Sequence, residues 1–184
     1  MMKRSIGSLL ALLTPFVLTF CNDNESNVVT PIVNGSVDIF DACDPATFTA
    51  ALGVGTCTGE GTISPVITFR EFLAELAANK SVGAWRFDPT SLTITAGGTI
   101  TATNLGGATH TFTEVAHFGG GTVPLLNQAS GNPSEAPECA AITDADLIAS
   151  EASFKTAPLI GAGTHLFQCC IHPWMRETVT VSGP

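Results

Sequence analysis

A group of sulfur and imidazole side chains lies near the C-terminus, in the run Cys169-Cys170-Ile171-His172-Pro173-Trp174-Met175. Thiolate, imidazole and thioether are the ligands that favour copper in a trigonal electron-transfer site. The run is flanked by 164–169 and 178–181, which have strand character, so a tight loop could bring the ligands to one point. We therefore expect a copper ion to be bound there by three side chains, Cys169, His172 and Met175.

Such a site needs a second imidazole, and the chain has 4 histidines. His110 follows the strand-like segment 100–104 after a short loop, which makes it the natural candidate. His117 lies seven residues further on, so one strand carrying both would point them to opposite faces. His165 would face the same way as Cys169 but lie roughly 13 Å away along an extended chain. We interpret His117 and His165 as structural.

Two adjacent cysteines compete for the sulfur position. In an extended strand, Phe167 and Cys169 point to one face and Gln168 to the other. If Phe167 points into the core, Cys169 points inward and Cys170 outward. This pattern favours Cys169 as the ligand and leaves Cys170 as the alternative.

The part of the chain that must position these ligands has β character. Leu92 and Ile94 alternate with hydroxyl residues, the Gly97-Gly98 turn follows, and Ile100 and Ala102 alternate again, which predicts a hairpin. About seven short strands separated by Gly and Pro turns are typical of a Greek-key sandwich. The other expected strands are 85–87, 109–115, 153–158, 163–169 and 178–181.

The N-terminus has the pattern of an export signal over residues 1–21. Lys3 and Arg4 precede an apolar stretch, 6–20, that is too short for a spanning helix. Cys21 closes the signal as in a bacterial lipoprotein, although Phe20 replaces the usual small residue. Lipidation of Cys21 and ordinary cleavage nearby both stay open. We expect an exported protein of the periplasm or cell-envelope surface, attached to a membrane only through such an anchor.

Three further segments follow this signal. Residues 22–40 are polar and predict a flexible tether. Residues 41–82 predict a helical subdomain packed on the core, because Thr68 and Glu71 form a capping box ahead of an amphipathic run. Residues 83–184 form the predicted β domain. The expected fold is an all-β Greek-key sandwich with a small N-terminal helical, disulfide-bearing extension.

The motif Cys169-x-x-His172-Pro173-x-Met175 resembles the ligand loop of the cupredoxins, the blue (type 1) copper proteins, in their plastocyanin and amicyanin form. Segment 92–110 resembles the strand, turn, strand and His-bearing loop of that family. The resemblance implies one type 1 copper held by His110, Cys169 and His172, with Met175 as a long axial ligand. It also implies electron transfer through an exposed His172. Thr111 departs from the family, where Asn commonly follows the first His and bonds across the two loops.

The chain has 6 cysteines, which in an exported protein indicates disulfides. Cys43 and Cys57 bracket a short Gly-rich loop and are the simplest pair. That choice would leave Cys139 to pair with Cys170, although four cysteines allow three pairings.

Composition limits the functions to consider. The net charge is −9 and no basic stripe exists, which disfavours nucleic-acid binding. No nucleophile, general acid or open substrate position is implied, so we do not expect an enzyme. We expect a monomeric single-electron carrier with transient redox partners. The alternative is a copper storage or donor protein with the same ligands.

Overall fold

The computed structural model describes residues 34–59 and 65–183. The predicted signal, Cys21 and most of the predicted tether lie outside these residues. Within them, no helix has both the length and the apolar character needed to cross a bilayer.

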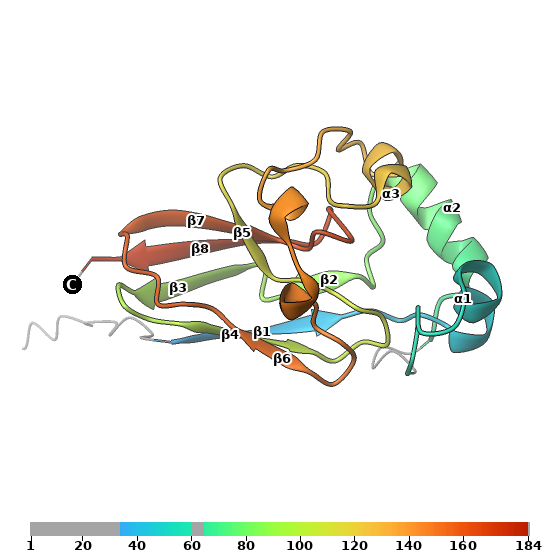
Figure 1. Ribbon diagram of the computed structural model, residues 1–184, viewed down its shortest axis with the longest axis horizontal. Helices are drawn as coiled ribbons and strands as arrows, with labels where there is room; N and C mark the ends of the chain where they lie inside the picture. The colour runs from blue at the N-terminus through green and yellow to red at the C-terminus, as the bar shows by residue number, and fades with distance from the viewer. Residues whose placement is uncertain (1–33, 60–64, 184) are drawn as a thin grey trace, which may run out of the picture.

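Two four-stranded sheets face each other in the sandwich (Figure 1). The first sheet has the order β2-β1-β4-β6, with bounds Arg86–Asp88, Gly35–Phe40, Ile100–Asn104 and Ser153–Lys155. The second has the order β3-β8-β7-β5, with bounds Ser91–Thr95, Arg176–Ser182, Gly163–Gln168 and Thr113–Val115. The β1–β4 and β3–β8 pairs are parallel, and the other pairs are antiparallel. The predicted all-β sandwich is confirmed.

Alternating side chains build the core between the sheets. Ile94 on β3 and Ile100 on β4 are fully buried, as are Val179 and Val181 on β8, while the intervening threonines are less buried. Period-two alternation is what a strand with one face on a core requires. The patterning therefore determines which face of each strand points inward.

The first strand was not predicted. Gly35–Phe40 lies in the expected tether, but β1 pairs in parallel with β4 and antiparallel with β2. Val37 and Ile39 enter the core and alternate with exposed Ser36 and Asp38. The sandwich thus begins at residue 35 and not at residue 83. The strand has only six residues and adjoins a polar segment, so its alternation was too short to be recognised in the sequence.

The predicted hairpin is also wrong. β3 and β4 lie in different sheets, so the Gly97-Gly98 turn is a corner that carries the chain from one sheet to the other. Gly97 has a φ of 87°, a left-handed conformation that favours glycine, and Gly98 bridges to Leu159. Alternation identifies a half-buried strand but does not identify its partner.

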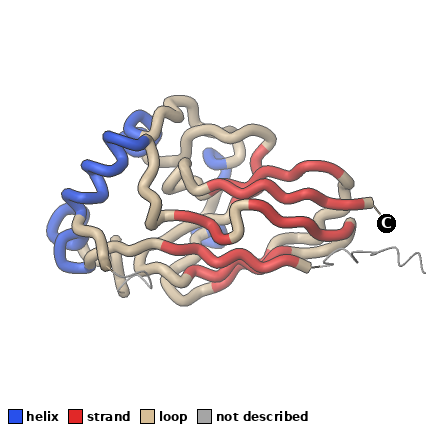
Figure 2. The backbone as a smooth tube through the Cα atoms, turned by 180° about the vertical axis from the view of Figure 1, so that it is seen from behind, coloured by secondary structure: helices blue, strands red, loops and turns tan. Residues whose placement is uncertain are grey.

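Three helices lie at one end of the sandwich (Figures 1 and 2). α1 spans Pro45–Leu52, α2 spans Phe69–Asn79 and α3 spans Pro124–Ala129. The predicted capping box of Thr68 and Glu71 opens α2. Phe48 and Phe72 belong to the same buried cluster as the sheet residues, so α1 and α2 are packed on the sandwich core. Short 3-10 turns at Cys139–Ala141 and Asp144–Asp146 follow α3.

Glu177 on β8 gives a testable pH dependence of stability. Its side chain is buried and neither carboxylate oxygen has a hydrogen-bond partner among the described residues. Burial raises the pKa of Glu177 to about 8. The folded state therefore favours the protonated carboxyl, and the free energy of unfolding falls as pH rises from the ordinary carboxyl range to about 8.

We expect Glu177→Gln to remove this loss, which is on the order of a few kcal/mol above pH 8. Thermal unfolding measured from pH 4 to pH 9 should show a gain in Tm that grows with pH up to about 8. Glu135→Gln, at an exposed position, is the control. A Tm difference that does not change with pH would contradict this explanation.

Candidate metal centre

The predicted ligands meet at the helix-bearing end of the sandwich. Cys169 directly follows β7, and His172 lies in the turn into β8, whereas His110 comes from the segment between β4 and β5. The Nδ1 atoms of His110 and His172 are 3.2 Å apart and lie 3.8 and 3.7 Å from Cys169 Sγ. The three buried donors all fall within 4.8 Å of one another, which suits a single ion.

Met175 lies in the same turn and is buried. Its carbonyl accepts a hydrogen bond from Cys169 N at 3.1 Å, and its N–H donates to the His172 carbonyl at 2.9 Å. These two bonds close the turn on itself. The backbone of the predicted axial ligand is thereby tied to both of the other ligands in the loop.

The two adjacent cysteines have different roles. Cys170 forms a disulfide with Cys139, and Cys43 forms one with Cys57, so both expected pairs are confirmed. Cys169 is the free thiol of the described residues and is buried. Because Cys170 is held in its disulfide, Cys169 provides the sulfur donor.

The sulfur of Cys169 is surrounded by donors. The backbone N–H groups of Thr111 and His172 each lie 3.4 Å from Sγ. Burial alone would raise the pKa of the Cys169 thiol, but hydrogen bonds and electrostatic interactions with His110 and His172 lower it well below the ordinary value. The site therefore favours the thiolate, which is the form that binds a metal.

Thr111 makes the bond between the two ligand-bearing segments. Its Oγ1 accepts a hydrogen bond from Cys170 N at 2.8 Å, and the residue is fully buried. The sequence left this cross-loop bond in doubt because the family's usual Asn is absent. A threonine hydroxyl supplies the same kind of acceptor here.

The second nitrogen of His110 meets a carboxylate that sequence reasoning missed. Asp41, directly after β1, places Oδ2 2.9 Å from His110 Nε2, and both side chains are fully buried. Burial alone would raise the pKa of Asp41. The hydrogen bond to His110, the charge of His110 and hydrogen bonds from two backbone N–H groups instead lower the pKa of Asp41 to about 2. Burial likewise opposes the charged form of His110, yet Asp41 and Cys169 raise its pKa to about 9.

His172 is less exposed than the family resemblance implied. It is only 8% exposed, and burial lowers its pKa. Its ring lies at a cavity of about 380 Å³ whose walls include residues of α1, α2 and α3. Gly106, Gly107 and Pro173, which lie near the ligands in the sequence, are buried as well. The three helices cover this end of the sandwich and leave the cavity beside His172.

The other two histidines lie outside the cluster. His117 is exposed. The ring of His165 lies 2.6 Å from Glu114 Oε1 and 2.7 Å from the Gly161 carbonyl. Among the described residues, the potential metal-binding group contains His110, Cys169 and His172 and neither of these histidines.

Two four-stranded sheets face each other, and the potential metal ligands lie on two loops at one end of them. This arrangement identifies the architecture. The chain has a cupredoxin fold. The thiolate of Cys169, the imidazoles of His110 and His172 and the thioether of the buried Met175 are together the side-chain types typical of a type 1 copper site. The chemistry of this donor set fits copper, because soft sulfur ligands combined with imidazole favour it over hard cations.

The chain is similar to several solved copper-protein structures. No family model and no curated protein matches the chain. A purple cupredoxin from Nitrosopumilus maritimus is 15% identical, with a TM-score of 0.43, over 81% of this chain and 100% of its own. The plastocyanin of Dryopteris crassirhizoma is 29% identical over 55% of this chain and 93% of its own, with a TM-score of 0.37. An amicyanin variant is 20% identical over 53% and 73%, with a TM-score of 0.36.

The cross-loop bond can be tested with Thr111→Val, which keeps the shape but removes the acceptor. Because the buried Cys170 N–H would lose its partner, we expect the free energy of unfolding to fall by about 1–3 kcal/mol. Denaturant titration of the metal-free protein measures this loss. Thr101→Val is the control, since Thr101 is half-buried and has no side-chain hydrogen bond among the described residues. Equal effects of the two substitutions would argue against the bond.

Proposed function

We propose that the protein is a single-electron carrier that binds one type 1 copper through His110, Cys169, His172 and Met175. The observation that carries this proposal is the buried thiolate with two imidazole nitrogens within 4.8 Å of one another. Bound copper would supply a one-electron couple between Cu(I) and Cu(II). The chain itself holds the donors on two tied loops, so the ligands need to move little when the charge of the ion changes.

Burial of the ligands favours a carrier over a copper donor and over an enzyme. His110 and Cys169 are fully buried, and Met175 is 1% exposed. A donor must release its metal readily, and an enzyme must let substrate reach the reacting atoms. Enclosed ligands hinder both, whereas electrons can pass through the protein without any group leaving.

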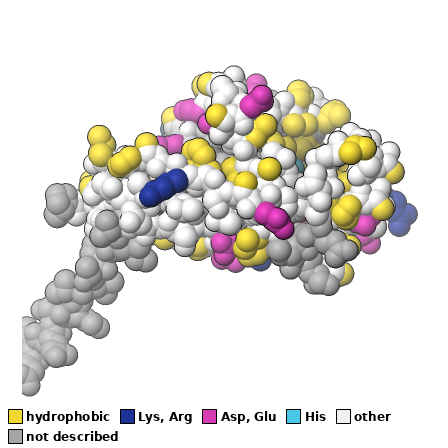
Figure 3. All heavy atoms as spheres, turned by 60° about the horizontal axis from the view of Figure 1, so that its bottom comes forward, with side chains coloured by type: hydrophobic (Ala, Val, Ile, Leu, Met, Phe, Trp, Pro, Cys, Tyr) yellow, Lys and Arg dark blue, Asp and Glu magenta, His cyan; other side chains and the backbone are white. Residues whose placement is uncertain are grey.

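We propose that electrons enter and leave through His172 at the base of the apolar cavity. Leu52, Leu73 and Leu125 line the cavity and are 56%, 46% and 77% exposed. Large exposed apolar side chains around one opening are typical of a contact surface. On the face that Figure 3 shows, acidic side chains are scattered and do not gather into a patch. A transient redox partner would therefore meet a small apolar ring around the cavity.

We also propose an exported, monomeric protein of the cell envelope. The disulfides Cys43–Cys57 and Cys139–Cys170 suit an oxidising compartment, and residues 1–21 have the pattern of an export signal. Cys21 would be the attachment point if the mature protein is lipidated.

Copper retention and electrochemistry together test the carrier function. We expect one copper per chain, a reversible one-electron wave in voltammetry, and slow loss of copper to a strong chelator. Cys169→Ser should lose the wave, because a hydroxyl does not replace the soft thiolate. Rapid and complete transfer of copper to the chelator would instead support the donor alternative.

The electron route can be tested with Leu125→Lys. A charged side chain at the apolar opening should slow electron exchange between two copper-loaded molecules by about tenfold or more, because each encounter would pair like charges and bury them. The reduction potential should stay unchanged, since Leu125 is 77% exposed and the new charge would lie in solvent.

Ile160→Lys is the matched control, because Ile160 is 81% exposed and adjoins the Gly98–Leu159 bridge, away from the cavity. NMR line broadening measures electron self-exchange in both variants. If the two variants exchange electrons equally fast, the cavity is not the route.

A further inference from the structure

The carboxylate of Asp41 is fully saturated with hydrogen-bond donors. Oδ2 lies 2.9 Å from His110 Nε2 and accepts from Ala108 N at 2.9 Å. Oδ1 accepts from Gly107 N at 3.0 Å and from Cys43 N at 3.2 Å. The side chain is 0% exposed, and four donors around a buried group indicate that it is held ionised.

The orientation of the His110 ring follows from this contact. Its Nδ1 faces Cys169 and His172, so Nε2 carries the hydrogen and donates it to Asp41. A carboxylate on the far nitrogen of a metal-binding histidine fixes the tautomer and the ring angle and makes the metal-facing nitrogen more basic. Asp41 is 69 residues away from His110 in the chain, so this contact depends on the fold.

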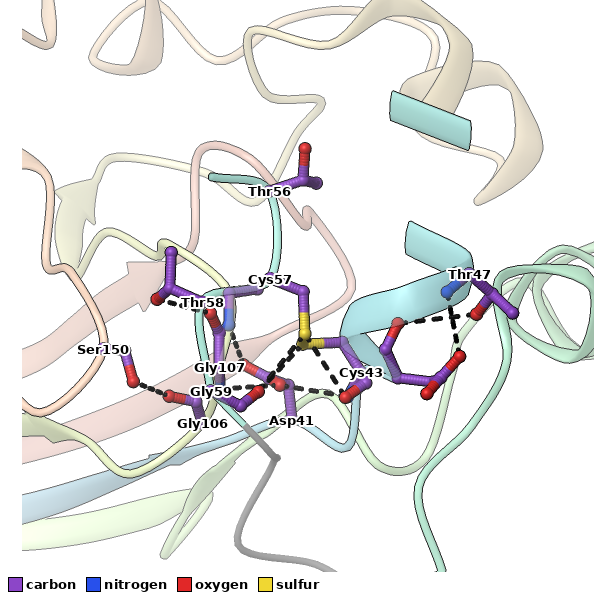
Figure 4. The surroundings of a disulfide bond; sticks show 12 residues. Asp41, Cys43, Thr47, Thr56, Cys57, Thr58, Gly59, Gly106, Gly107 and Ser150 are labelled. Carbon is purple, nitrogen blue, oxygen red and sulfur yellow. Dashed lines mark hydrogen bonds between the residues drawn. A yellow bond between two sulfur atoms is a disulfide. The ribbon is translucent and has the colours of Figure 1, made fainter. Parts of the chain in front are cut away.

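The N-terminal disulfide holds Asp41 in place (Figure 4). Cys43, two residues beyond Asp41, is joined to Cys57, and Thr58 N then donates to the Gly107 carbonyl at 2.8 Å. The loop 105–109, which leads to His110, is thus bound to Asp41 on one side and to residue 58 on the other.

Two glycines let the loop 105–109 lie close to Asp41 and to Gly59. A Cβ atom at Gly106 would overlap the Asp41 carboxylate, and one at Gly107 would overlap the Gly59 carbonyl. Ser150 also donates from Oγ to the Gly106 carbonyl at 2.7 Å. The disulfide-bearing segment and the His110 loop are therefore shaped to fit each other.

We propose that Asp41 is a positioning residue of the copper site, which orients His110 and lowers the reduction potential of the copper. This inference rests on the proposed function. A buried negative charge one imidazole ring away from the ion stabilises Cu(II) more than Cu(I), and the buried surroundings screen it little. The disulfide-bearing segment between β1 and β2 then has a role at the site, because it holds the carboxylate in place.

Asp41→Asn tests the proposal, because it removes the charge while keeping the size of the side chain. We expect a clear shift of the reduction potential to more positive values, with one copper still bound and the Cys169-to-copper absorption retained. Asp44→Asn is the matched control. It removes the same charge three residues away at the N-cap of α1, where Asn caps as well as Asp, and its potential should equal that of the wild type. A folded Asp41→Asn protein with the wild-type potential would overturn the proposal.

The wild-type protein provides a second test, which decides the matter if Asp41→Asn does not fold. In the copper(I) form with ¹⁵N-labelled histidine, the His110 Nε2 proton should be strongly shifted downfield and should exchange slowly with water. A rapidly exchanging proton at an ordinary shift would overturn the contact. Failure of the wild type to bind copper with a one-electron couple would instead overturn the proposed function, so the two failures are distinguishable.

Discussion

The central constraint on this molecule is the burial of a thiolate between two imidazoles. A charged sulfur without partners would be costly inside a protein, so the surroundings must hold Cys169 and its neighbours together before a metal arrives. Backbone N–H groups of Thr111 and His172 point at the sulfur, and the Thr111 hydroxyl ties the upstream segment to the loop that carries Cys170. The sandwich positions the ligand segments, because Cys169 directly follows β7 and the loop that leads to His110 follows β4.

The helical segment between β1 and β2 covers the ligand-bearing end of the sandwich. α1 and α2 pack Phe48 and Phe72 against Trp85, and Trp85 in turn lies 6.5 Å from the His172 ring centre. The histidine that would pass electrons to a partner is thereby recessed at the base of an apolar cavity. A partner would have to reach into this opening, which restricts the shapes that can approach closely. The same segment begins with Asp41, which contacts His110, so residues between β1 and β2 surround one histidine and bind the other.

Patterns within short stretches of sequence predicted the ligands in the loop and the buried face of each strand. They did not predict contacts between residues that are distant in the chain. Cys169, His172 and Met175 are close in sequence, and strand alternation correctly placed Cys169 with Phe167 in the main core. Cys170, predicted to point outward, is buried too, in a second cluster on the opposite face of the strand. The strand β1 was missed because its six residues adjoin a polar segment, and Asp41 was missed with it. The β3–β4 hairpin failed because a turn with two glycines can either reverse a chain within a sheet or carry it to the other one. The recessed position of His172 depends on three helices that meet only in the folded molecule.

The absorption spectrum of the copper-loaded protein tests the central claim most directly. Titration with one equivalent of Cu(II) should produce an intense visible band from charge transfer between Cys169 and copper, and Cys169→Ser should lack it. A wild-type protein that binds copper with only the weak absorption of nitrogen and oxygen ligands would contradict the proposed site.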